Sequence, residues 1–73
     1  MDPKEALDEL SLATLEAFDY GYQGRIARGY RILTVGLFEA RKATSEGADQ
    51  VVELWEQVMA RFRQRFPNDG YLD

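Results

Sequence analysis

The chain has 73 residues, with 9 basic and 13 acidic side chains, which gives a formal net charge of −4. It contains neither cysteine nor histidine, which excludes disulfides, thiolate metal sites, a thiol nucleophile and the commonest general base. The hydrophobic fraction of 45% is that of a folded chain, and the length predicts one domain spanning residues 1–73.

The sequence contains no motif of a calcium-binding loop, a phosphate-binding loop, a dinucleotide site or a hydrolase nucleophile. We therefore expect no enzymatic activity, no cofactor and no metal. No run of about 18 apolar residues is present, and three of the first five residues, Asp2, Lys4 and Glu5, are charged. These features predict a cytoplasmic protein without a membrane partner.

The first predicted helix covers about residues 3–20. Asp2 is suited to cap it, and Glu5 occupies the capping-box position three residues later. A periodicity of about 100° per residue predicts one buried face. That face consists of Ala6, Leu7, Leu10, Thr14, Ala17 and Phe18. Gly21 and Gly24 are expected to end the helix.

The second predicted helix covers about residues 24–42, and its buried face contains two glycines. The residues of this face are Ile26, Gly29, Tyr30, Leu33, Gly36, Leu37 and Ala40. A glycine inside a helix costs about 1 kcal/mol relative to alanine. We expect Gly29 and Gly36 to offset that cost by allowing a large side chain of another helix to approach closely.

The third predicted helix covers about residues 48–66 and has the clearest apolar face. The face consists of Val51, Val52, Trp55, Val58, Met59, Phe62 and Phe66. Ser45 and Asp49 are both suited to cap this helix, and the sequence does not choose between them. Pro67 ends the helix and begins a short tail over residues 67–73.

These patterns predict an all-α fold, a small three-helix bundle. The alternative is a helical hairpin, continuous through Gly21, that is completed by dimerisation. Charge is segregated, because the first helix is mostly acidic and the second mostly basic. The simplest interpretation of that segregation is attraction between the two helices.

Apolar residues outside the expected core suggest an interaction surface, since charged rims around apolar groups mark binding sites. The predicted partner-binding residues are Arg28, Arg31, Ile32, Val35 and Phe38 on the second helix, with Leu12 and Leu15 on the first. The competing interpretation is that the second helix contacts both neighbours and that its wide apolar arc is core.

A second interpretation is nucleic-acid binding through Arg25, Arg28, Arg31 and the nearby Tyr22, because arginine and aromatic side chains bind phosphates and stack on bases. A weak helix-turn-helix pattern around Gly21 coincides with these residues. The net charge of −4 opposes duplex binding, which depends on basic contacts.

The sequence thus favours a small acidic protein–protein interaction module. We expect a regulator or inhibitor that docks on a larger complex, such as transcription or nuclease machinery. A nucleic-acid-binding helical domain and a structural homodimer are the alternatives. The identity of the partner, the pathway and the oligomeric state stay open.

Overall fold

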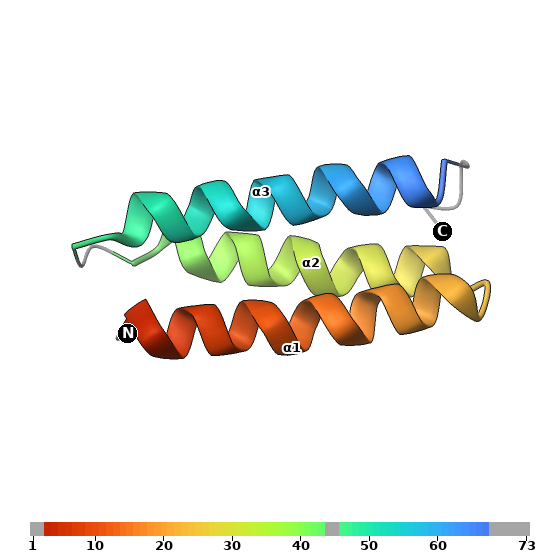
Figure 1. The fold of residues 1–73 in the computed structure, drawn as a ribbon, viewed down its shortest axis with the longest axis horizontal. Helices are drawn as coiled ribbons and strands as arrows, with labels where there is room; N and C mark the ends of the chain where they lie inside the picture. The colour runs from red at the N-terminus through yellow and green to blue at the C-terminus, as the bar shows by residue number, and fades with distance from the viewer. Residues whose placement is uncertain (1–2, 44–45, 68–73) are drawn as a thin grey trace.

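The computed structural model describes residues 3–43 and 46–67. The helices are α1 (Pro3–Tyr22), α2 (Ile26–Arg41) and α3 (Ala48–Arg65). They lie lengthwise in a bundle of 36 × 17 × 17 Å, with α2 antiparallel to both α1 and α3 (Figure 1). All three helices contact one another. The prediction of an all-α three-helix bundle is confirmed, and the described residues contain no strand.

The connection between α1 and α2 is a tight turn around Gly24, whose φ is +84°. The Arg25 N–H donates to the Tyr20 carbonyl oxygen at 2.8 Å, which closes the turn. The hairpin alternative, with the first two helices continuous, is therefore wrong. The first helix extends two residues beyond the expected end, because Gly21 is helical and packs against the Phe66 ring.

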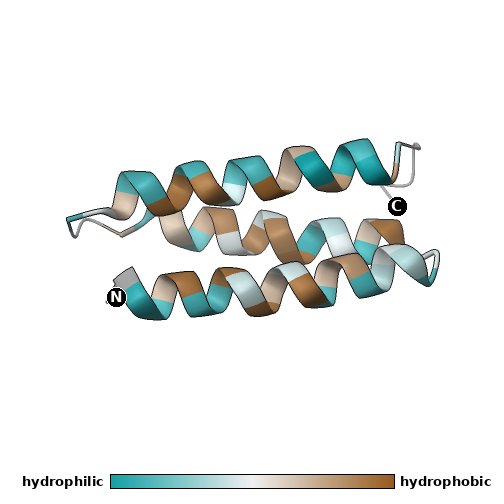
Figure 2. Ribbon diagram, viewed as in Figure 1, coloured by the Kyte–Doolittle hydropathy of each residue, from teal (hydrophilic) through white to brown (hydrophobic). Residues whose placement is uncertain are grey.

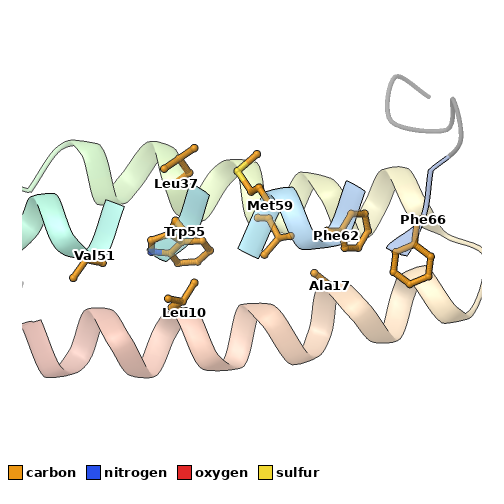
Figure 3. Close-up of a cluster of buried hydrophobic side chains, with 9 residues drawn as sticks. Leu10, Ala17, Leu37, Val51, Trp55, Met59, Phe62 and Phe66 are labelled. Atoms are coloured by element: carbon orange, nitrogen blue, oxygen red, sulfur yellow. The ribbon is translucent and has the colours of Figure 1, made fainter. Parts of the chain in front are cut away.

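The core is a single cluster of apolar side chains contributed by all three helices (Figure 3). In the described part of the chain its buried members are Leu10, Ala17, Leu33, Leu37, Val51, Trp55, Met59, Phe62 and Phe66. All of them belong to the predicted faces. Leu7 was also predicted to be buried, but 42% of it is exposed, because it lies at the edge of that face. On α3, apolar residues face the other helices and the outward side is hydrophilic (Figure 2).

The two helical glycines of α2 admit large side chains, as predicted. A Cβ atom on Gly36 would collide with the indole ring of Trp55. A Cβ atom on Gly29 would collide with the carbonyl oxygen of Ala17 and would lie 3.0 Å from Cζ of Phe62. These contacts let α2 approach both neighbouring helices.

The N-terminus of α3 differs from the expectation. Gly47 occupies the capping position with φ +85°, and no side chain caps the helix there. Asp49 is therefore not the cap; it lies in the first turn, where a carboxylate stabilises the helix dipole. The other predicted caps, Ser45 and Asp2, lie outside the described residues, as does the tail after Pro67.

Candidate functional site

Four of the apolar side chains assigned to partner binding are on the surface. The exposed fractions are 55% for Val35, 61% for Phe38, 61% for Leu12 and 70% for Leu15. Ile32 differs, because it is half-buried and packs against the core cluster. Ile32 is therefore partly core, whereas the other four apolar residues are not.

A shallow groove follows the junction of α1 and α2, and we call it the α1/α2 groove. Its lining residues are Glu16 and Tyr20 of α1 with Ala27, Arg28, Arg31, Ile32 and Val35 of α2. The structure thus brings four of the predicted partner-binding residues into one surface. Phe38 is outside the lining and lies one helical turn beyond Val35, with the Lys42 ammonium 4.7 Å from its ring centroid.

The arginines of the α1/α2 groove are not neutralised by α1. The guanidinium of Arg28 lies 5.5 Å from the ring centroid of Tyr20, a cation–π contact. Within residues 3–43 and 46–67, Arg28 and Arg31 make neither an ion pair nor a side-chain hydrogen bond. Although α1 is mostly acidic and α2 mostly basic, Arg28 and Arg31 therefore form no ion pair with the described residues of α1.

Two ion pairs of the described residues involve the C-terminal end of α2. Arg41 lies 3.7 Å from the Glu56 carboxylate of α3, and Lys42 lies 3.4 Å from Glu39. Both pairs are exposed to solvent, so each contributes at most about 1 kcal/mol. They leave the basic N-terminal half of α2 available to a ligand.

A second groove, the α1/α3 groove, lies on the other flank of α1. Its lining residues are Thr14, Leu15, Phe18, Asp19 and Tyr22 of α1 with Arg61 and Arg65 of α3. The Arg65 guanidinium lies 4.9 Å from the ring centroid of Tyr22, which is 63% exposed. The sequence analysis did not include Arg61 or Arg65 among the candidate binding residues. Their spacing of four residues was a signal that they share a face, but not that this face adjoins Leu15.

The residues proposed for nucleic-acid binding are divided between different surfaces. Arg28 and Arg31 line the α1/α2 groove, whereas Tyr22 lines the α1/α3 groove. Arg25 is exposed next to the turn and lines neither groove. The antiparallel packing of α1 and α2 also differs from the crossing of about 90–120° in a helix-turn-helix.

The described residues contain no polar or charged residue that is buried and no carboxylate group of three or more that would hold a metal ion. None of the described helices combines the length and the apolar character of a membrane span. Each groove combines apolar surface with two guanidinium groups and one carboxylate, Glu16 or Asp19. The excess of positive charge suits binding of an apolar surface that carries anionic groups.

Comparison of the chain with protein-family models, with curated protein sequences and with solved structures gave no match.

Proposed function

We propose that this protein is a non-enzymatic protein–protein interaction module, and that its α1/α2 groove binds an acidic amphipathic helix of the partner. The observation that carries the proposal is the position of Val35, which is 55% exposed in a groove that also contains Arg28 and Arg31. This combination provides an apolar contact and two cationic groups within two turns of one helix.

The energetics of such a contact favour a helical ligand. A groove between two antiparallel helices accepts the apolar face of a third helix, whose side chains then repeat every three or four residues. Full burial of a side chain such as Val35 or Phe38 stabilises a complex by about 1.5–3 kcal/mol, before the cost of ordering the partners. Carboxylates of the partner would make charge-assisted hydrogen bonds to the two arginines and would orient the bound helix.

We further propose that binding itself is the activity. A regulator or inhibitor of a larger complex acts by occupying one of its surfaces, and transcription or nuclease machinery stays the class of complex that we favour. We place this interaction in the cytoplasm. Apolar anchors surrounded by charged groups support a role in binding, because a few such anchors provide most of the affinity of an interface.

The test is affinity capture from a lysate of the source organism or its host. The baits are the wild-type protein, Val35→Glu and Leu15→Glu, each first shown by circular dichroism to be folded. Both substitutions place a carboxylate at an exposed helical position, so Leu15→Glu is a matched control on a different surface. We expect the wild type and Leu15→Glu to capture one protein that Val35→Glu loses.

Two results of this experiment would contradict the proposal. Equal capture by Val35→Glu would show that the α1/α2 groove is not the binding surface. Capture that disappears after nuclease treatment would instead favour the nucleic-acid alternative. The acidic nature of the ligand is tested with Arg28→Glu/Arg31→Glu, which should reduce capture as strongly as Val35→Glu.

A further inference from the structure

We propose that the bound helix extends beyond the α1/α2 groove and pairs with the whole outward side of α2 as a two-stranded coiled coil. This inference rests on the proposed function and adds the length and the charge order of the partner segment. It starts from a line of exposed residues on α2, which we call the α2 seam. The α2 seam consists of Arg28, Arg31, Val35, Phe38 and Lys42, the last of which is the C-cap residue of the helix.

The spacing of the α2 seam is that of a coiled coil. Its residues follow one another at intervals of three, four, three and four, which is the alternation of the a and d positions in a heptad repeat. The opposite side of α2 packs into the bundle through Gly29, Leu33 and Leu37. The α2 seam is therefore a second contact line, and its apolar centre is exposed, Val35 by 55% and Phe38 by 61%.

Charge is unevenly distributed along the α2 seam. At its N-terminal end, Arg28 and Arg31 form no ion pair with the described residues. Of the described residues that line the groove beside these two arginines, Glu16 alone is acidic. At the C-terminal end, the Lys42 ammonium lies 3.4 Å from the Glu39 carboxylate, which offsets its charge.

Two flanking charges increase this difference. Arg25 is exposed three residues before Arg28 and adds to the basic end. Glu9 precedes Glu16 by seven residues, so both lie on the same flank of α1. Because α1 and α2 are antiparallel, Glu9 lies towards the Phe38 end of the α2 seam (Figure 1). The excess of positive charge is thus confined to the N-terminal end of the α2 seam.

A second copy of the chain fits the α2 seam poorly. An antiparallel pair that places Val35 on Phe38 of the second copy also places Arg31 on Lys42 of the second copy, and this contact occurs twice. A parallel pair places each cation of the α2 seam on its own counterpart. Like charges at facing positions are unfavourable, whereas carboxylates of a foreign helix would be attracted to both arginines.

The partner segment is therefore defined by the order of its side chains. It is a helix with two apolar residues, three or four positions apart, that face Val35 and Phe38. Its carboxylates lie one to two turns away, on one side of the apolar pair only, where they face Arg28 and Arg31. The line from Arg28 to Lys42 is about 21 Å long, so the partner helix needs about four turns to cover it.

The probe is a synthetic helical peptide of three heptads. The a and d positions carry glutamate in one terminal heptad and leucine in the other two, and the peptide is made in both orders so that either orientation can bind. The measurement is a nuclear magnetic resonance titration of the labelled protein with up to about 1 mM peptide. We expect one order to shift the amides from Arg28 through Phe38 to Lys42. Lysine in place of the glutamates should raise the Kd at least tenfold.

Variants of the folded protein test the extension beyond the groove. Phe38→Glu should raise the peptide Kd at least tenfold, and Thr34→Glu, an exposed position of α2 outside the α2 seam, should leave it unchanged. Shift changes confined to the α1/α2 groove, or an unchanged Kd for Phe38→Glu, would overturn the coiled coil while leaving the proposed function intact.

Two further results would overturn the inference. One is the absence of binding by either peptide order at about 1 mM. The other is a wild-type chain that dimerises in sedimentation analysis and that Phe38→Glu keeps monomeric, which would assign the α2 seam to a second copy. Failure of the proposed function is detected separately, by equal capture with the Val35→Glu bait.

Discussion

The indole ring of Trp55 lies against the α-carbon of Gly36, and a methyl group at that position would overlap three atoms of the ring. Trp55 is only 3% exposed and belongs to the core cluster. The absence of a side chain at Gly36 therefore determines how closely α3 packs on α2. The close contact compensates for the low helix propensity of glycine.

Gly36→Ala should therefore destabilise the fold, although alanine is the better helix former by about 1 kcal/mol. Overpacking of this kind costs about 1–3 kcal/mol, so the expected net change in the free energy of unfolding is a loss. The measurement is chemical denaturation followed by circular dichroism. Thr34→Ala, an exposed position on the same helix, is the control and should change stability little. A higher stability of Gly36→Ala would refute the role assigned to the Trp55 contact.

Gly24 is required for its backbone conformation rather than for space. Its φ of +84° is left-handed, and no atom beyond Gly24 and its two chain neighbours lies within 4 Å of the position that a Cβ atom would take there. Gly24→Ala should lower the free energy of unfolding by about 1–2 kcal/mol through strain alone.

Gly24→Asn is the matched variant for this position, because asparagine tolerates the left-handed region better than alanine does. Its loss of stability should be smaller than that of Gly24→Ala. Equal losses in the two variants, measured by thermal denaturation, would mean that φ is not the cause.

The core was largely predictable because apolar periodicity reports burial directly. The predicted faces include every buried residue of the described core, and the close approach at Gly29 and Gly36 followed from their place inside such a face. Leu7 was wrongly predicted to be buried. Periodicity gives the direction in which a side chain projects from its helix, but not how wide a strip of the helix the neighbouring helices cover.

The candidate grooves were predictable only in part. The exposure of Val35 and Leu15 followed from their angle on each helix. The meeting of Arg61 and Arg65 with Leu15 depends on how α3 is rotated against α1, and no single helix contains that information. Tyr22 was expected on the same surface as Arg28, but the two residues line different grooves. Their separation also depends on how the helices pack together, so one helix alone could not reveal it.

Nucleic-acid binding should be absent or weak. The arginines of α2 and the exposed Tyr22 lie on separate surfaces, and the chain has a net charge of −4. We expect no mobility shift of duplex or single-stranded oligonucleotides even at low salt, where phosphate contacts are strongest. A shift that disappears in the triple variant Arg25→Ala/Arg28→Ala/Arg31→Ala would instead establish the nucleic-acid alternative.

The central claim is that the α1/α2 groove is the binding surface, and nuclear magnetic resonance of the isotope-labelled protein tests it most directly. The titrant is the purified protein captured by the wild-type bait. We expect chemical-shift changes centred on the amides of Ala27, Arg31 and Val35, with small changes at Leu15 and Tyr22. Changes centred on Leu15 and Tyr22, with those of the α1/α2 groove unaffected, would contradict it.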